Sequence, residues 1–248
     1  MVDIYNEDCL EGMKRISDGS VDMILTDLPY GITDCAFDVR IPFEPLWEQF
    51  KRVTKRNAAI ALFSQMPFGA ELIMSNRKMF RYKWCWIKSQ GGGYLNAKKM
   101  PLRIHEDILI FYQQLPTYNP QKWQSVPKSR FHNAKSNSKN YSHVGSNFYD
   151  NKDGLRYPLD VVNFNIDNNA VNKLHPQQKP TDLLEYLIRT YSNEGETVLD
   201  ATMGSGSTGV AAVNTNRNFI GFELDENFFK VAQKRISEAV AQREQSLF

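Results

Sequence analysis

The sequence predicts an α/β fold built on a single, largely parallel, Rossmann-like sheet. Six short apolar runs rich in β-branched and aromatic residues have the length of buried strands, namely Val21–Leu25, Ala58–Phe63, Tyr82–Ile87, Ile108–Tyr112, Thr197–Leu199 and Phe219–Phe222. Strands that alternate with helical segments favour a parallel sheet covered on both faces. A chain of 248 residues with 42% hydrophobic content can bury the core that such a sheet needs.

Helices are predicted around these strands. Apolar stripes indicate one helix over residues 43–53 and a second that follows Pro180. A third helix is expected over residues 228–241, after Glu223. Asp182 is the expected N-cap of the second helix because Glu185 follows it three residues later. These helices alternate with the strands in the order that an α/β fold requires.

Charge and cysteine content exclude several classes of protein. The 30 basic and 28 acidic residues nearly cancel, so any basic surface is local. Cys9, Cys35 and Cys85 have no short spacing, which argues against a disulfide framework and a cysteine-based metal site. No stretch approaches the roughly 18 apolar residues of a membrane span. We therefore expect a cytoplasmic protein without membrane contact and without a metal.

A polar segment, residues 113–174, interrupts the alternation of strands and helices. It carries eight Lys and Arg residues against four Asp and Glu residues, a net charge of +4. One interpretation is a surface excursion of the domain. The other is an insertion that contacts nucleic acid, with basic side chains on phosphates. The expected phosphate contacts are Lys122, Lys128, Arg130, Lys135 and Lys139.

Three consecutive glycines, Gly91–Gly93, lie between two predicted strands and are followed by Lys98 and Lys99. Glycines give a mobile loop. The loop is either an ordinary hairpin connection or a flap that closes over a substrate, and the sequence favours neither. Lys98 and Lys99 join the expected nucleic-acid contacts.

A glycine turn follows the strand at Thr197–Leu199 and leads into an Ala- and Val-rich helix. Gly204, Gly206 and Gly209 satisfy G-x-G-x-x-G, which alone also fits a dinucleotide site. Asp200 precedes this turn, and Glu223 ends the next strand, where an acid can accept ribose hydroxyls. A carboxylate beside the turn repels a pyrophosphate and attracts a cation. The pattern therefore favours S-adenosylmethionine, a sulfonium nucleoside, over a dinucleotide.

A second polar turn, Asp27-Leu28-Pro29-Tyr30, follows the strand at Val21–Leu25. Because the carboxyl ends of parallel strands meet at one edge of a sheet, we expect Asp27 and Asp200 on the same rim. The Asp27 carboxylate and the Leu28 carbonyl can accept both N–H groups of a base amino group, and Pro29 biases Leu28 towards an extended backbone. Tyr30 offers a ring on which a flipped base can stack.

These motifs resemble those of the permuted (beta-group) DNA amino-methyltransferases, the N6-adenine and N4-cytosine DNA methylases. Asp27–Tyr30 resembles the family's D-P-P-Y, and Asp200–Thr208 resembles its D-P-F-x-G-S-G-T cofactor motif. His175–Pro180 resembles H-P-T-Q-K-P, Tyr5–Leu10 resembles the segment whose acid, here Asp8, contacts the cofactor adenine, and His105–Phe111 matches an H-E-x-I-L strand. The likeness covers about residues 3–112 and 173–241.

The resemblance implies a circularly permuted methyltransferase sheet over residues 1–248, with residues 113–174 as an irregular target-recognition insertion. Asp27, Leu28, Pro29 and Tyr30 would be catalytic. The residues that would bind S-adenosylmethionine are Asp8, Asp27, Lys179, Asp200, Ala201, Thr202, Gly204, Ser205, Gly206, Thr208 and Glu223. An initial Asp in the tetrad favours N6-adenine. The implied partners are double-stranded DNA and a cognate restriction endonuclease, and the family allows a monomer or a homodimer.

Two departures from the family pattern keep other functions open. Leu28 replaces the first proline of the tetrad, and Ala201-Thr202 replaces Pro-Phe in the cofactor motif. The alternatives are an N4-cytosine DNA methyltransferase, a catalytically silent DNA-binding homologue, and a methyltransferase of RNA or a small molecule. A dinucleotide-dependent oxidoreductase is the least favoured, because the acids at both ends of the turn do not suit it.

Overall fold

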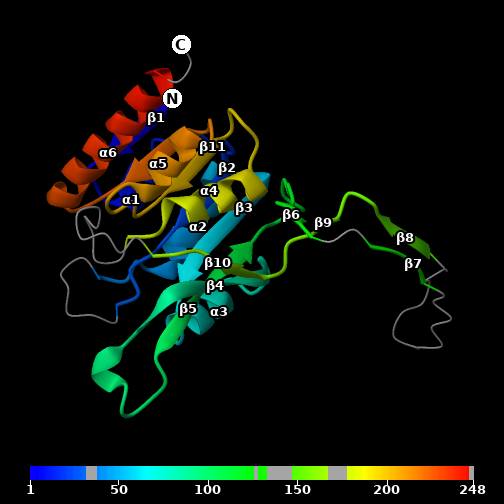
Figure 1. Ribbon diagram of the computed structural model, residues 1–248. Helices are drawn as coiled ribbons and strands as arrows, with labels where there is room; N and C mark the ends of the chain where they lie inside the picture. The colour runs from blue at the N-terminus through cyan, green and yellow to red at the C-terminus, as the bar shows by residue number, and fades with distance from the viewer. Residues whose placement is uncertain (32–37, 126–127, 133–146, 167–177, 246–248) are drawn as a thin grey trace. The chain divides into compact units, whose positions relative to one another are not determined.

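The computed structural model describes residues 1–31, 38–125, 128–132, 147–166 and 178–245, and the chain forms two compact units. The main unit consists of residues Met1–Asn119 and Asp160–Phe248 (Figure 1). The second unit consists of Pro120–Leu159. The main unit holds every strand and helix that was predicted from the sequence.

The main unit is built on an eight-stranded sheet with the order β1-β12-β11-β2-β3-β5-β4-β10. The strands are β1 (Val2–Tyr5), β2 (Val21–Thr26), β3 (Thr54–Ser64), β4 (Phe80–Gly92), β5 (Arg103–Phe111), β10 (Val161–Asn163), β11 (Thr197–Asp200) and β12 (Asn218–Phe222). The first five strands in the spatial order are mutually parallel, whereas β5 is antiparallel to both β3 and β4. The carboxyl ends of these five parallel strands lie at the same edge of the sheet, here called the rim.

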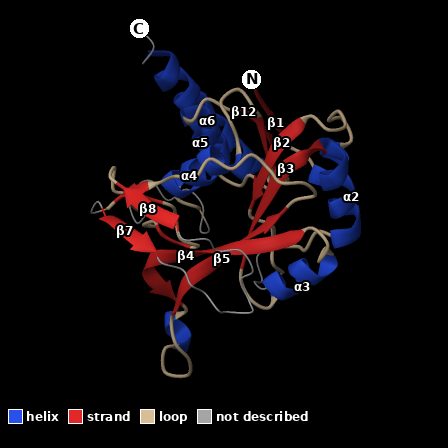
Figure 2. Ribbon diagram, turned by 90° about the vertical axis from the view of Figure 1, so that its right-hand side faces the viewer, coloured by secondary structure: helices blue, strands red, loops and turns tan. Residues whose placement is uncertain are grey.

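Helices cover both faces of this sheet (Figure 2). One face carries α1 (Cys9–Met13), α2 (Phe43–Val53) and α3 (Phe68–Ser75), and the other carries α4 (Thr181–Tyr191), α5 (Ser207–Asn214) and α6 (Glu226–Gln245). Alternate residues of the central strands therefore enter two separate apolar cores: Ile24 packs with α2 and Met23 with α4. The near-continuous burial of β2 and β3 follows from this double cover.

The structure confirms the six predicted strands and the four predicted helices, which include α5 after the glycine turn. It differs from the prediction at the start of α4 and at the edge of the sheet. Asp182 is not the N-cap of α4. Pro180 holds that position with an extended backbone, φ −61° and ψ 130°, so the helix begins at Thr181 and Asp182 lies in its first turn. There its negative charge still faces the positive end of the helix dipole. The edge strand β1 was not predicted, because its four residues are all only half-buried and show no alternation.

Within residues 113–174 the structure describes short strand pairs and one strand of the main sheet. In the second unit β6 (Trp123–Gln124) pairs with β9 (Leu155–Arg156), and β7 (Lys128–His132) pairs with β8 (Asn147–Asn151). The chain then returns to the main unit, where β10 pairs with β4. The compact second unit is therefore shorter than the polar segment that the sequence marks out.

The Gly91–Gly93 segment is a hairpin connection, the first of the two alternatives that the sequence left open. β4 and β5 pair as far as Gly92 and Arg103, and a 3₁₀ turn, Tyr94–Asn96, lies at the tip. Gly93 has a φ of +91°, a conformation that favours glycine. The hairpin projects from the main unit in Figure 1.

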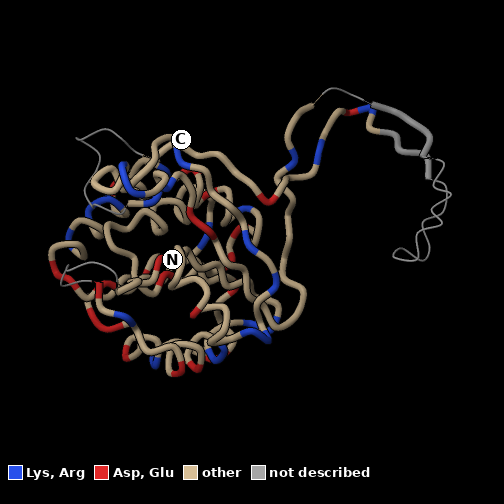
Figure 3. The backbone as a smooth tube through the Cα atoms, turned by 90° about the horizontal axis from the view of Figure 1, so that it is seen from below, with Lys and Arg blue, Asp and Glu red and all other residues tan. Residues whose placement is uncertain are grey.

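Basic and acidic residues are interspersed along the described backbone (Figure 3), as the small net charge of +2 leads one to expect. None of the helices in the described ranges is long and apolar enough to cross a membrane.

Candidate active site

Four acids mark the rim of the parallel sheet. Glu223 and Asp27 directly follow β12 and β2, Asp200 is the last residue of β11, and Asp8 follows β1 by three residues. Since these strands are neighbours in the order β1-β12-β11-β2, the acids succeed one another along one edge as Asp8, Glu223, Asp200 and Asp27. The expectation that Asp27 and Asp200 share a rim is confirmed by this topology.

These acids open into one cavity of about 620 Å³, a size suited to a nucleoside-sized ligand. Most of the residues predicted for the site line it: Asp8, Asp27, Leu28, Pro29, Lys179, Asp200, Ala201, Thr202, Gly204, Ser205, Thr208 and Glu223. Phe63, Asp225 and Phe228 also line it, and none of these three was predicted from the sequence. Tyr30 and Gly206 are not among the lining residues.

Asp200 lies buried at the start of the glycine turn and is surrounded by neutral donors. Its Oδ1 accepts the Thr202 N–H at 3.1 Å, and the hydroxyls of Thr208 and Thr26 also bond to the carboxylate. Burial raises the pKa of Asp200 to about 6, and these hydrogen bonds offset only part of that rise. Asp200 forms no ion pair within the described part of the chain. The carboxylate is therefore placed to receive a cation from a ligand.

Two glycines of the turn have different reasons to be glycine. Gly204 has a φ of +53°, a backbone conformation that favours glycine. A Cβ at this position would meet no atom within 4 Å, so the space beside the Gly204 backbone is open. Gly206 has a φ of +78°, and its Cβ would lie 2.9 Å from the Cα of Ala232 on α6. Helix α6 packs closely against the turn here, so packing requires a residue without a side chain. That Gly206 also binds the cofactor stays a prediction.

Glu223 and Asp8 each hold backbone groups beside the cavity. The two oxygens of Glu223 accept the N–H groups of Gly204 and Asp225, both at 2.8 Å. Asp8 caps α1 by accepting the N–H groups of Leu10 at 2.8 Å and Glu11 at 3.2 Å. Burial raises the pKa of Glu223. Both acids thus fix the cavity wall, and each carboxylate keeps lone pairs for a ligand hydroxyl or amine.

The tetrad is held rigidly at the end of β2. Tyr30 donates from its hydroxyl to Asp27 Oδ1 at 2.8 Å, and its ring stacks on Phe68 with a centroid distance of 4.8 Å. This stacking explains why Tyr30 does not line the cavity. Leu28 packs its side chain into the core with 3% exposure. The Thr202 hydroxyl donates to the Asp27 carbonyl at 3.0 Å, which ties the tetrad to the glycine turn.

Lys179 connects the tetrad to β5. Its ammonium donates to Asp27 Oδ2, lies 3.5 Å from Glu106 Oε2, and sits 5.0 Å from the centroid of the Phe63 ring. Burial alone would lower the pKa of Lys179, but Asp27 and Glu106 outweigh burial and raise it, so the side chain stays charged. Burial raises the pKa of Asp27 against the effect of Lys179.

Glu106 belongs to this cluster but was not predicted as a site residue from the sequence. Its Oε1 accepts from Lys88 and, at 3.1 Å, from Gln65. Burial favours a higher pKa for Glu106, but the lysines Lys179 and Lys88 hold the pKa below its ordinary value. The only signal in the sequence was its place in the His105–Phe111 stretch. Its contact with Lys179 joins positions 73 residues apart and follows from the fold.

The basic residues predicted to contact DNA are distributed over several elements. Lys98 and Lys99 are exposed on the β4–β5 hairpin. Lys122 lies in the second unit, 4.6 Å from the centroid of the Tyr157 ring. Lys128 and Arg130 belong to β7. Lys135, Lys139, Cys35 and the residues 175–177 of the H-P-Q-Q-K-P segment lie outside the described residues.

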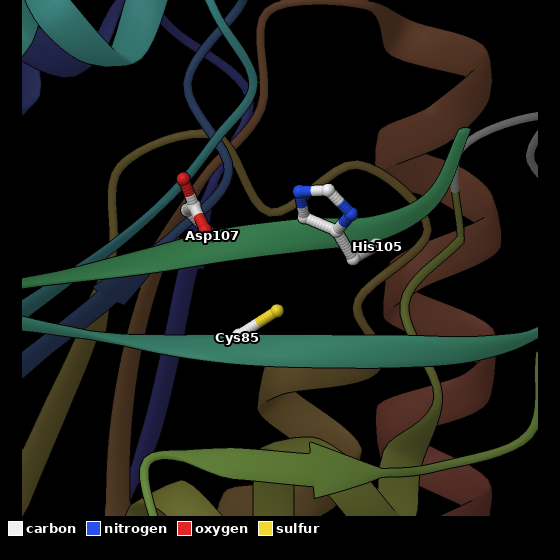
Figure 4. Close-up of side chains that lie close together, drawn as sticks. All are labelled: Cys85, His105 and Asp107. Atoms are coloured by element: carbon white, nitrogen blue, oxygen red, sulfur yellow. The ribbon is translucent and has the colours of Figure 1, made fainter. Parts of the chain in front are cut away.

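Cys85, His105 and Asp107 form a cluster on the other face of the β4–β5 ladder (Figure 4). Their sulfur, nitrogen and oxygen atoms lie within 4.8 Å of one another. Asp107 Oδ1 already accepts from Lys83 at 2.8 Å, so a metal ion there would have to compete with an ammonium group. Burial is the main cause of the raised pKa of Cys85, which disfavours the thiolate that a metal would bind. The cluster does not change the expectation that no metal is needed.

The sheet order, the glycine turn and the acid-lined cavity define an α/β enzyme with a nucleoside-cofactor site. The chain belongs to the DNA methylase family, whose sequence profile matches residues 21–234. It is 30% identical to the type II methyltransferase M.HpaI of Haemophilus parainfluenzae, over 92% of this chain and 71% of that protein. It is also 30% identical to the DNA adenine methyltransferase YhdJ of Escherichia coli K12, over 95% of this chain and 83% of that protein.

Solved structures share the fold. The complex of M1.HpyAVI with SAM has a TM-score of 0.65 and 22% identity, and the match covers 95% of this chain and 99% of that one. The cytosine-N4-specific PvuII DNA methyltransferase also has a TM-score of 0.65, with 14% identity over 97% of this chain and 92% of that one. The fold is therefore that of the DNA methyltransferases.

Proposed function

We propose that this protein methylates the N6 amino group of adenine in double-stranded DNA with S-adenosylmethionine as the methyl donor. The observation that carries the proposal is the shared cavity: Asp27 and Leu28 line the same space as Asp200 and the glycine turn. The hydrogen bond from Thr202 to the Asp27 carbonyl fixes the two turns relative to each other. A base held by one turn and a donor held by the other would meet in that space.

The cofactor half of the cavity fits a cationic nucleoside. Asp200 offers a buried carboxylate without a protein cation, Gly204 leaves room for close approach to the backbone, and Glu223 and Asp8 carry acceptor oxygens. These residues would hold the ammonium, sulfonium and hydroxyl groups of the cofactor. When bound, S-adenosylmethionine supplies an electrophilic methyl group on a sulfonium centre.

The base half of the cavity holds an amino group by two acceptors. A base amino nitrogen is a poor nucleophile because its lone pair is delocalised into the ring. Asp27 would accept one N–H, and the Leu28 carbonyl, to which no described residue donates a hydrogen bond, would accept the other. The nitrogen lone pair would then face the cofactor half. Most of the rate enhancement would come from this orientation and proximity.

Adenine is the base that we favour. The tetrad begins with Asp, which in the resembling family more often accompanies N6-adenine methylation, and YhdJ is named as an adenine methyltransferase. The second candidate is N4-cytosine, because the cytosine-N4-specific PvuII enzyme has the same fold. Asp27 and the Leu28 carbonyl would suit either amino group.

Basic side chains beyond the rim of the sheet would contact the DNA backbone. β4 runs parallel to β3 in the sheet, so the hairpin that follows it extends beyond the rim on which Asp27 lies. Exposed Lys98 and Lys99 on that hairpin would bind phosphates. We propose the segment 113–174, with Lys122, Lys128 and Arg130, as the region that recognises the target sequence.

The test is nucleoside analysis. The protein is incubated with methyl-labelled S-adenosylmethionine and DNA of mixed sequence, and the DNA is digested to nucleosides. We expect label in N6-methyladenine. Label in N4-methylcytosine alone would overturn the choice of adenine, and cofactor binding without transfer to any base would identify a silent homologue.

A further inference from the structure

A buried ion cluster beside the cavity places the ammonium of Lys179 between two acids, Asp27 and Glu106. Lys179, Asp27 and Glu106 have side-chain exposures of 11%, 19% and 9%. They come from distant parts of the chain: β2 is followed by Asp27, β5 contains Glu106, and Lys179 precedes α4. Lys179 is bonded to Asp27 but lies only 3.5 Å from Glu106 Oε2. The ammonium therefore has two carboxylates within reach.

Both oxygens of the Asp27 carboxylate are engaged. Oδ1 accepts from the Tyr30 hydroxyl and Oδ2 accepts from Lys179. An amino group that reacts with a sulfonium methyl gains positive charge, and an ammonium next to it would oppose that gain. A carboxylate already bonded to an ammonium is also a weaker acceptor for a neutral N–H. The arrangement around Asp27 thus does not suit the reacting base.

Glu106 offers the place to which the ammonium can move. Its Oε1 already accepts from Lys88 and Gln65. Its Oε2 is buried and accepts no hydrogen bond from the described residues, which is unfavourable for a buried acceptor. A shift that closes the 3.5 Å gap to the roughly 2.8 Å of a charge-assisted hydrogen bond would satisfy it. The Phe63 ring, whose centroid lies 5.0 Å from the ammonium, can keep its cation–π contact with Lys179 during this short shift.

We propose that Glu106 is a positioning residue that takes Lys179 away from Asp27 when the target base enters, so that Asp27 Oδ2 is free for the base amino group. The inference rests on the proposed function. No proton is transferred in this step: Lys179 remains an ammonium, both acids remain carboxylates, and only its hydrogen-bond partner changes. Glu106 acts through Lys179 and does not touch the base.

The test compares methyl transfer by the single variant Glu106→Gln with transfer by the double variant Glu106→Gln/Lys179→Met. In Glu106→Gln the ammonium stays on Asp27, so we expect kcat to fall about tenfold or more while the Kd for S-adenosylmethionine changes by less than about twofold. In the double variant no ammonium blocks Asp27, so we expect kcat to be higher than in Glu106→Gln. Glu106→Asp keeps the charge and should restore part of the rate.

Asp107→Asn is the matched control. Asp107 is the next residue on β5, is similarly buried and is also paired with a lysine, but it lies on the opposite face, so its variant should keep the wild-type kcat. An unchanged kcat in Glu106→Gln, or a double variant slower than Glu106→Gln, would overturn the proposal. Glu106→Gln protein that no longer binds S-adenosylmethionine would assign Glu106 a structural role instead. Wild-type protein that methylates no base would overturn the proposed function as well, which separates the two failures.

Discussion

The turns that follow β11 and β2 each present a buried acid to one cavity, but the partners of the two acids differ. Asp200 accepts hydrogen bonds from the Thr202 backbone and from threonine hydroxyls, all of them neutral. Asp27 is bonded to the Lys179 ammonium and the Tyr30 hydroxyl. An acid that awaits a cationic ligand needs no protein cation. Asp27 already has a protein cation beside it, so it needs no cation from a ligand and suits a neutral amino group.

Removal of the acid in the tetrad should have the largest effect. In Asp27→Ala we expect methyl transfer to fall by at least about 100-fold, because the main acceptor of the base amino group is lost. The Kd for S-adenosylmethionine should stay within about twofold of wild type, as measured by calorimetry. Full activity of Asp27→Ala would show that this turn does not hold the base.

Neutralisation of the acid in the glycine turn should act on the cofactor. We expect Asp200→Asn to weaken S-adenosylmethionine binding by about 30-fold or more, because a buried carboxylate loses its cationic ligand. Equilibrium binding measures this directly. S-adenosylhomocysteine lacks the sulfonium charge and serves as the control ligand, which should lose less affinity. An equal loss for both ligands would mean that Asp200 does not recognise the sulfonium.

The raised pKa of Asp200 predicts a pH dependence of cofactor affinity. With a pKa of about 6, roughly one-tenth of Asp200 is ionised at pH 5, so cofactor binding should be about tenfold weaker at pH 5 than at pH 8.

The same pKa shift makes the protein without cofactor lose stability as the pH rises from 3.8 to about 6, because the folded state binds the proton more tightly than the unfolded state in this range. Asp200→Asn should remove the contribution of Asp200 to the pH dependence of both cofactor affinity and stability. A wild-type cofactor affinity that does not change between pH 5 and pH 8 would contradict the role of Asp200 in cofactor binding.

The hairpin lysines test the DNA contact without touching either acid. We expect Lys98→Ala/Lys99→Ala to weaken DNA binding by about tenfold or less and to reduce the slope of log K against log salt by about 2. Lys55→Ala is the control, because Lys55 is paired with Asp22 at the opposite end of the strands. An unchanged salt slope in the double variant would exclude these lysines from the DNA interface.

The smallest effect is expected from Leu28→Pro, which restores the family tetrad. The proposed contribution of residue 28 is its carbonyl, so kcat should stay within about twofold of wild type. The buried Leu28 side chain should matter for stability instead, with a loss of about 1–2 kcal/mol in the free energy of unfolding. A large change in kcat would mean that the leucine side chain itself shapes the base site.

Local patterns predicted the parts of the molecule that depend on neighbours in the sequence. Strand burial, the glycine turn and the tetrad each lie within about ten residues, so their composition was sufficient. The Lys179–Glu106 contact and the Cys85–His105–Asp107 cluster were not predicted, because they form only when separate strands and loops come together. Gly206 satisfied a ligand-binding pattern, yet its position is required by the packing of α6, and spacing alone does not separate these two reasons.

The central claim is that Asp27 holds the target base and Asp200 holds the cofactor. It is tested most directly by the rate of methyl transfer to DNA as a function of S-adenosylmethionine concentration, measured for Asp27→Ala and Asp200→Asn side by side. We expect Asp200→Asn to recover most of the wild-type rate when the cofactor is saturating, because only cofactor binding is impaired. Asp27→Ala should remain inactive at every concentration. Recovery of Asp27→Ala with added cofactor, together with no recovery of Asp200→Asn, would contradict this claim.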